Sequence, residues 1–313
     1  MGMNDQDRSA LPRVGVVGLG AMGLGMARSL RDAGFDVGVH DLRPDVAAAF
    51  AEDGGTTFAS AGELAASVDV LVGVVVNAAQ VESVLFATGG ADGAAERLRP
   101  GSVYVMCSTA DPTWSAELER RLAERGVLYL DAPISGGAAR AANGELTMMT
   151  SGAPTAYAIA DPVLEAMSST VYRLGDEAGI GSKVKVVNQL LAGVHIAAAA
   201  EAMALGIKAG VPADALYEVI THSAGNSWMF ENRMAHVLAG DYTPLSAVDI
   251  FVKDLGLVLD AARPEKFPLP LAATAHQMFL QASASGLGGE DDSAVIKIFP
   301  GIELPGQAER SEG

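Results

Sequence analysis

The chain has 313 residues, half of them hydrophobic, and a formal net charge of -17 at pH 7. This length is enough for two domains with separate cores, and the acidic balance argues against nucleic acid or a membrane surface as a partner. The single cysteine, Cys107, excludes an internal disulfide, and the chain opens without an apolar leader, so we expect a cytoplasmic protein.

Seven short runs rich in β-branched residues occur before residue 177, and amphipathic stretches separate most of them. These runs are RVGVVG, FDVGVH, VDVLVGVVV, SVYVMCS, VLYLDAP, ELTMMTS and TVYRLGD. Their alternation with helical patterns predicts an α/β fold with a doubly wound parallel sheet of the Rossmann type over residues 1–176. Residues 177–313 show only helical patterns, which predicts an all-α second domain built on one long interdomain helix.

The first run leads into the glycine-rich segment GLGAMG. Its glycines form a G-x-G-x-x-G pattern between a strand and a helix, the arrangement that places a dinucleotide pyrophosphate on the helix N-terminus. The first glycine permits the tight turn, the second lets the phosphates approach, and the third allows close helix packing. We therefore predict cofactor contacts along the whole loop, at Gly18, Leu19, Gly20, Ala21, Met22 and Gly23.

The second run ends just before Asp41, near the position from which a Rossmann domain meets the adenosine ribose. A carboxylate there accepts both ribose hydroxyls and repels a 2′-phosphate, which favours NAD over NADP. Leu42 and Arg43 complete this part of the predicted cofactor site, although Arg43 could instead neutralise a 2′-phosphate. The alternative without function is an exposed turn aspartate before Pro44.

Ser135, Gly136 and Gly137 follow a later strand, at the carboxyl edge where open α/β sheets bind ligands. A hydroxyl beside consecutive glycine amides suits a substrate carboxylate. The alternative is a flexible turn without a ligand.

The segment GIGSKVKVVNQ begins the long helix, with Ser182 as its expected N-cap. Lys185, Asn188 and Gln189 are spaced i, i+3 and i+4, so they share one helical face. A surface lysine with an extended stem is the alternative for Lys185. The apolar tract that follows is interrupted by polar residues such as His195, so we expect a buried helix rather than a membrane span.

Four motifs in order, namely the glycine loop, DAPISGGAARAANGELT, GIGSKVKVVNQ and FVKDLGL, resemble the β-hydroxyacid dehydrogenase family over nearly the whole chain. The resemblance implies that Lys185 is the catalytic lysine and that Asn188 or Gln189, where many relatives carry two asparagines, is its amide partner. It also implies that the Ser135 segment holds the substrate carboxylate. Further cofactor contacts are implied at Val76, Asn77, Thr109 and Lys253, the first two replacing a leucine–proline pair of relatives.

Longer strings, such as AGNSWMFENRM and DYTPLSAVDIFVKDLGLV, imply within this family a four-carbon sugar acid as substrate, oxidised at C2 with NAD. Neutral Lys185 would remove the hydroxyl proton, and desolvation together with the positive nicotinamide would lower its pKa toward the working pH. The run from Ala197 to Ala200 permits close helix contact, which suits either an interdomain or a subunit interface. We expect an oligomer, either a homodimer or a homotetramer.

Two other functions stay open: a semialdehyde or imine reductase on the same fold, and a dinucleotide-binding regulator without turnover. The lysine at position 185 counts against an imine reductase, and the complete set of lysine, amide and carboxylate site counts against a regulator. No metal is predicted, because the histidines lack ligand spacing, and Cys107 is expected to be a packed core thiol. Trp228, Met229 and Phe230 are expected to pack, with a place in the substrate pocket as the alternative.

Overall fold

The computed structural model describes residues 11–52, 54–86 and 93–306. It divides into two compact units, one ending at Lys185 and the other beginning at Val186. The first unit has two hydrophobic cores and the second unit has one. Most of the N-terminal segment from which we argued against a leader lies outside the described residues.

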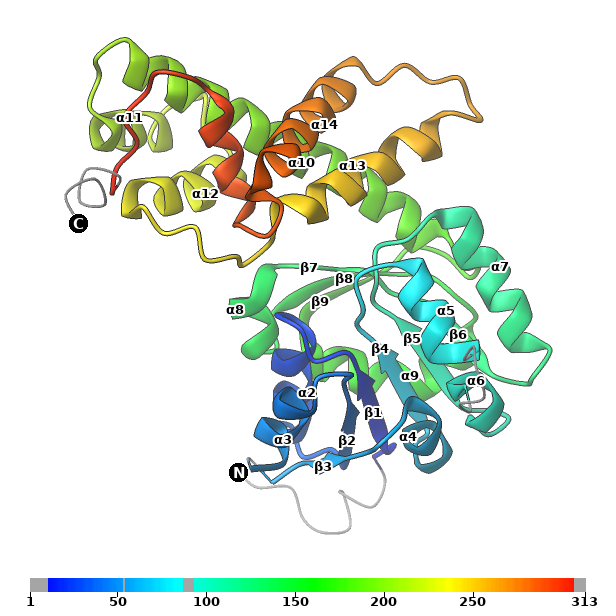
Figure 1. Ribbon diagram of the computed structural model, residues 1–313. Helices are drawn as coiled ribbons and strands as arrows, with labels where there is room; N and C mark the ends of the chain where they lie inside the picture. The colour runs from blue at the N-terminus through cyan, green and yellow to red at the C-terminus, as the bar shows by residue number, and fades with distance from the viewer. Residues whose placement is uncertain (1–10, 53, 87–92, 307–313) are drawn as a thin grey trace. The chain divides into compact units, whose positions relative to one another are not determined.

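A six-stranded parallel sheet forms the centre of the first unit, in the order β3-β2-β1-β4-β5-β6 (Figure 1). The strands are β1 Val14–Val17, β2 Val37–His40, β3 Thr56–Thr57, β4 Val70–Gly73, β5 Val103–Met106 and β6 Leu128–Asp131. The order reverses between β1 and β4, so the loops that follow these two strands lie side by side at the carboxyl edge. The predicted Rossmann-type sheet is confirmed.

Alternate side chains of β1, β4, β5 and β6 enter two cores, one on either face of the sheet. Val103 and Val105 pack with residues of α2 (Gly23–Asp32) and α9 (Pro154–Met167), whereas Tyr104 and Met106 pack with residues of α4 (Ala61–Ser67) and α7 (Pro112–Ala123). Both faces are buried, which is why these runs read as continuously apolar. The helices are α2 Gly23–Asp32, α3 Pro44–Glu52, α4 Ala61–Ser67, α5 Ala78–Phe86, α6 Ala94–Arg97, α7 Pro112–Ala123, α8 Gly137–Ala142 and α9 Pro154–Met167.

Two of the seven predicted strands lie outside the main sheet. β8 (Leu146–Thr150) and β9 (Ser168–Arg173) pair in parallel and form a second sheet with the short β7 (Ile134–Ser135), which runs antiparallel to β8. The sequence predicted strands in both places but assigned them to one parallel sheet, and that assignment is wrong. The sequence pattern of a segment indicates that it forms a strand, but the strand with which it pairs depends on packing against other parts of the chain.

The second unit is helical throughout its described residues, apart from one isolated β-bridge between Ala247 and Asp291. Phe230, Phe251 and Phe279 from three different helices meet in its core. The predicted all-α character is confirmed. The helices are α10 Ile180–Lys208, which crosses from the first unit into the second, α11 Ala213–Thr221, α12 Trp228–Ala239, α13 Val248–Ala262 and α14 Pro270–Ala282, followed by a π turn at Ser283–Leu287 and a 3₁₀ helix at Asp292–Ile298.

Among the described residues, α10 is the one helix long and apolar enough to cross a membrane by length and composition. Ile196, Ala200 and Met203 of this helix are fully buried in the core of the second unit. A core helix of a globular domain is buried in this way. The length and composition of α10 are therefore not evidence for a membrane span.

Candidate active site

The glycine loop joins β1 to α2 and has the backbone geometry that the pattern predicts. Gly18 has a φ of +92°, and a Cβ there would lie 2.4 Å from the Val74 carbonyl oxygen of the neighbouring loop. A Cβ at Gly23 would lie 1.9 Å from the Gly18 carbonyl oxygen, whereas a Cβ at Gly20 would meet nothing within 4 Å. Gly18 and Gly23 are therefore fixed by protein packing, and the loop at Gly20 faces open space. These residues fit a bound pyrophosphate.

Asp41 follows β2 and is held toward the same loop. Its Oδ2 accepts from the backbone N–H of Leu19 at 2.6 Å, and its Oδ1 accepts from the Arg43 backbone N–H at 2.8 Å and Nε at 3.1 Å. Burial alone would raise the pKa of this carboxyl, but the hydrogen bonds from Arg43 and Leu19 hold it below its ordinary value. Leu42 is 91% exposed, an uncovered apolar side chain beside the carboxylate.

Val76, Asn77 and Thr109 lie in loops that follow β4 and β5, on the same carboxyl edge as the glycine loop. The Asn77 side chain accepts from the Gln80 backbone N–H at 2.9 Å and so caps α5. The Gln80 side chain in turn accepts from the Val76 backbone N–H at 2.8 Å. Asn77 therefore has a structural role in the local helix, in addition to the cofactor contact that the resemblance implies.

The structure brings Lys185 to the Ser135 segment. The Lys185 side chain is only 7% exposed, and its Nζ donates to the Ile134 carbonyl oxygen at 2.8 Å, one residue before Ser135. Gly136 and Gly137 have φ values of +136° and +78°, a backbone that excludes most side chains. Lys185 therefore lies next to the segment that carries the Ser135 hydroxyl and the Gly136 and Gly137 amides, all within the first unit.

The sequence reasoning missed Asp131, which holds the start of α10. This fully buried carboxylate accepts from the Gly179 and Ser182 backbone N–H groups at 2.9 and 2.8 Å and from the Ser182 hydroxyl at 2.7 Å. Burial raises the pKa of Asp131, and the same hydrogen bonds oppose that rise. The prediction of Ser182 as N-cap is wrong, because α10 begins at Ile180 and Asp131 caps it from another segment. The signal in the sequence that could have identified Asp131 is an aspartate at the end of an apolar strand.

The amide residues and Lys253 belong to a second network, around Asp254 of α13. The Gln189 Nε2 donates to Asp254 Oδ2 at 2.6 Å, and Asn188 Nδ2 donates to Gln189 Oε1 at 3.0 Å. Lys253 Nζ lies 2.6 Å from Asp254 Oδ1. Asp254, which is 2% exposed, was also missed by the sequence reasoning, although it stands beside Lys253 in the quoted motif.

The remaining residues singled out in the sequence show ordinary packing. Cys107 is buried, and burial raises the pKa of its thiol, so an inert core residue is the right description. Phe230 is buried and Met229 packs against the same core, whereas Trp228 is 54% exposed, so the expectation that all three residues pack is wrong for Trp228. Within residues 11–52, 54–86 and 93–306, no group of three or more histidine, cysteine or acidic side chains could hold a metal ion.

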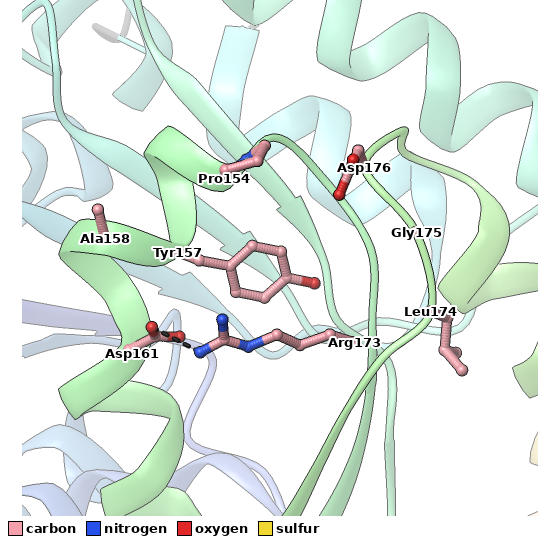
Figure 2. Close-up of a pocket in the computed structure, with 8 residues that line it drawn as sticks. All are labelled: Pro154, Tyr157, Ala158, Asp161, Arg173, Leu174, Gly175 and Asp176. Carbon is pink, nitrogen blue, oxygen red and sulfur yellow. Dashed lines mark hydrogen bonds and ion pairs between the residues drawn. The ribbon is translucent and has the colours of Figure 1, made fainter.

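A separate groove lies beside α9 and β9 of the first unit (Figure 2). Arg173 crosses it, with its Nη2 2.6 Å from Asp161 Oδ2 and its guanidinium carbon 4.7 Å from the Tyr157 ring centre. The guanidinium is thereby occupied by protein groups, and the groove contains none of the predicted site residues.

A Rossmann-type unit with a fitting phosphate loop and a buried lysine beside a serine–glycine segment defines a nicotinamide-dependent dehydrogenase. The comparisons agree. The family described as "NAD binding domain of 6-phosphogluconate dehydrogenase" matches residues 13–175, and "NAD-binding of NADP-dependent 3-hydroxyisobutyrate dehydrogenase" matches residues 179–299. The chain belongs to the β-hydroxyacid dehydrogenase family, as its motifs implied, and is an NAD-dependent oxidoreductase acting on a CH–OH group.

Two relatives and one solved structure illustrate the similarity. The L-threonate dehydrogenase of Cupriavidus necator is 66% identical over 296 residues, covering 95% of this chain and 99% of the relative. The L-threonate dehydrogenase of Escherichia coli (strain K12) is 55% identical, covering 94% and 96%. A crystal structure of a Salmonella typhimurium protein, described as a 3-hydroxyisobutyrate dehydrogenase, is 56% identical with a TM-score of 0.87, covering 92% and 99%.

Proposed function

We propose that this protein oxidises L-threonate at C2 to 2-dehydro-L-erythronate, with NAD as hydride acceptor. The observation that carries the proposal is the buried Lys185, whose Nζ lies 2.8 Å from the carbonyl oxygen next to Ser135. The substrate follows from the relatives, since proteins named L-threonate dehydrogenase are 52% to 66% identical to this chain. We further propose a nicotinamide-binding domain up to residue 176 and a helical domain from residue 177.

In this reaction Lys185 takes the proton of the C2 hydroxyl as general base, from a buried position in which its Nζ lies beside the Ser135 segment. Ser135 and the amides of Gly136 and Gly137 hold the carboxylate, which fixes the position of C2. NAD, when bound, supplies the acceptor for the hydride that leaves C2. In the opposite direction the protonated lysine polarises the ketone oxygen.

The residues of the first unit proposed to hold the cofactor lie at the carboxyl edge of the main sheet. The glycine loop takes the pyrophosphate, and Asp41 with Leu42 takes the adenosine end. We propose NAD rather than NADP, because an ionised Asp41 repels a 2′-phosphate. Arg43 is paired with that carboxylate and so is occupied by it. Val76, Asn77, Thr109 and Lys253 complete the proposed cofactor contacts.

We also propose a cytoplasmic homo-oligomer, either a dimer or a tetramer. Val187, Leu191 and Leu205 of α10 are 60%, 50% and 70% exposed, an unusual state for long apolar side chains at helical spacing. A second copy of the chain would cover them. Sedimentation velocity of the purified protein tests this: a single monomeric species at micromolar concentration contradicts it.

The proposed activity is tested by following NADH absorbance with L-threonate, 3-hydroxyisobutyrate and L-erythronate, the C2 epimer of L-threonate. A site built to bind several hydroxyls rejects an analogue that lacks them, so kcat/KM is highest for L-threonate. A second candidate, 3-hydroxyisobutyrate oxidation, is favoured by the 56% identity to the Salmonella typhimurium protein described as a dehydrogenase of that acid. A higher kcat/KM for 3-hydroxyisobutyrate replaces the first proposal with this one.

A further inference from the structure

Arg140 of α8 lies over the segment that is proposed to hold the substrate carboxylate. A Cβ on Gly136 would lie 3.1 Å from the Arg140 Cβ and 2.9 Å from its Cδ. The stem of Arg140 therefore runs along Gly136, as expected for a helical side chain that points back over the preceding turn. Because the guanidinium follows directly after Cδ, it stands at the Gly136 end of this segment, within the first unit.

The Arg140 guanidinium is exposed and makes no hydrogen bond, ion pair or ring contact with any described residue. Each of the other arginines in the described ranges engages another protein group. Arg43 is held by Asp41, for example, and Arg173 by Asp161. In a chain with a formal net charge of -17, an arginine that no carboxylate occupies is suited to an anionic ligand.

The proposed chemistry requires a fixed positive charge at this segment. A serine hydroxyl and backbone amides can orient a carboxylate, but they carry no net charge. Lys185 donates to the Ile134 carbonyl oxygen, and it has to be neutral when it accepts the hydroxyl proton, so it cannot then balance the carboxylate charge. An arginine stays protonated at any working pH and presents paired N–H groups to a carboxylate.

We propose that Arg140 binds the carboxylate of the substrate and selects hydroxyacids over uncharged analogues of the same shape. This inference rests on the proposed hydroxyacid oxidation. Ser135 and the glycine amides orient the carboxylate, Arg140 balances its charge, and Lys185 gains and loses the proton. Substrate binding and proton transfer therefore depend on different cations.

Removing the charge tests the assignment. We expect Arg140→Gln to raise KM for L-threonate by roughly tenfold to a hundredfold, the range for a lost hydrogen bond to a charged group. The value of kcat should change by less than about threefold, because the contact is made equally in the ground state and the transition state. Arg140→Lys keeps a charge without the paired N–H groups and should recover part of the loss.

Arg120→Gln is the matched control for the loss of one positive charge. Arg120 lies on α7 of the first unit, and its side chain is 61% exposed. KM for L-threonate should stay at the wild-type value in this variant. An unchanged KM in Arg140→Gln, or an equal rise in both variants, overturns the proposal.

A substrate without charge gives a signature that a purely structural role does not produce. The primary amide of L-threonate has the same hydroxyls but no carboxylate charge. The wild type should prefer the acid over this amide in kcat/KM, and Arg140→Gln should lower the preference by about the factor by which it raises KM. Equal losses with the acid and the amide overturn the proposal, because they assign Arg140 to the local structure.

Binding without turnover separates the substrate from the cofactor as the ligand of Arg140. With NADH bound in place of NAD, L-threonate is not oxidised, and isothermal titration calorimetry measures its Kd. Arg140→Gln should raise this Kd by the same factor as KM and leave the Kd of NADH unchanged. A weaker NADH complex with an unchanged Kd for L-threonate assigns the guanidinium to a cofactor phosphate and overturns the proposal.

Failure of the proposed function gives a different result. A wild type that prefers 3-hydroxyisobutyrate replaces the proposed substrate, but that acid carries the same carboxylate, so Arg140→Gln should raise its KM by the same factor. A wild type that binds L-threonate through Arg140 and oxidises no hydroxyacid overturns the proposed function alone. An unaffected KM for the preferred acid overturns the role of Arg140 alone.

Discussion

The cofactor loop of the first unit and the polar networks of the second are built by different means. In the loop, backbone conformation decides the structure: Gly18 needs a positive φ, and Gly23 has no room for a Cβ. In the second unit, buried side chains decide it, through the pairs Gln189–Asp254 and Arg233–Asp292. Backbone constraints leave a local mark in the sequence, whereas a pair of buried side chains depends on a partner about sixty residues away.

The largest expected effect belongs to Lys185. Its position depends on a side-chain contact, because Asp131 caps the start of α10, and on the backbone, because its Nζ donates to the Ile134 carbonyl oxygen. We expect Lys185→Ala to lower kcat by roughly a hundredfold to ten-thousandfold, the range of general acid–base catalysis, with little change in NADH affinity. Steady-state kinetics and NADH fluorescence titration measure the two quantities.

Lys185→Arg should lose nearly as much, because a guanidinium stays protonated at any working pH. Lys183→Ala, two residues away and exposed, is the matched control and keeps the wild-type rate. The rise of kcat with pH in the oxidation direction should also disappear in Lys185→Ala. A near-normal rate that still rises with pH would place the base elsewhere, with His195 on the same helix as the next candidate.

The second unit should be the more sensitive to loss of one polar partner. Arg233 Nη2 donates to Asp292 Oδ2 at 3.2 Å, and the Asp292 side chain is fully buried. Arg233→Ala leaves this carboxylate without its cation and should cost about 3–5 kcal/mol in the free energy of unfolding. Urea unfolding measures the loss.

The paired variant Arg233→Met with Asp292→Leu provides the control. Because it removes both charges, it should recover most of the stability that Arg233→Ala loses. Equal instability of the single and the paired variant would mean that packing, and not the unpaired charge, stabilises this region.

The same contrast explains how far the sequence could be interpreted. The glycine loop and all seven long strands were predictable, because periodicity and glycine spacing are local. The sheet to which β8 and β9 belong was not, nor was the short β7, whose pairing joins Ile134 to Met148. Ser182 seemed the natural cap of α10 because the true cap, Asp131, comes from a strand 51 residues earlier. For the same reason the sequence left Asn188 and Gln189 as equal alternatives.

Within the loop, two glycines should respond differently to the same added methyl group. Gly23→Ala forces a Cβ against the Gly18 carbonyl. We therefore expect the free energy of unfolding to fall by about 1–3 kcal/mol and NADH binding to weaken. Gly20→Ala meets no protein atom within 4 Å, so its stability should stay within about 0.5 kcal/mol of wild type.

NADH binding to Gly20→Ala should nevertheless weaken, because the added methyl occupies the space that the phosphates approach. Urea unfolding and NADH fluorescence titration on both variants separate packing from ligand approach. Unchanged NADH affinity in Gly20→Ala would remove Gly20 from the cofactor site.

The smallest expected effect concerns the choice between NAD and NADP, where a side-chain pair lies beside the backbone-defined loop. With Asp41 ionised near the ribose, kcat/KM for NAD should exceed that for NADP by at least about tenfold, equivalent to 1.4 kcal/mol. Asp41→Ser should narrow this ratio, since it removes the repulsion and releases Arg43 Nε, now 3.1 Å from Asp41 Oδ1, to meet a 2′-phosphate. Adding Arg43→Ala to Asp41→Ser should then abolish the gain with NADP while leaving the rate with NAD nearly unchanged. Equal use of both cofactors by the wild type would show that the Asp41–Arg43 pair stabilises the loop and does not select the cofactor.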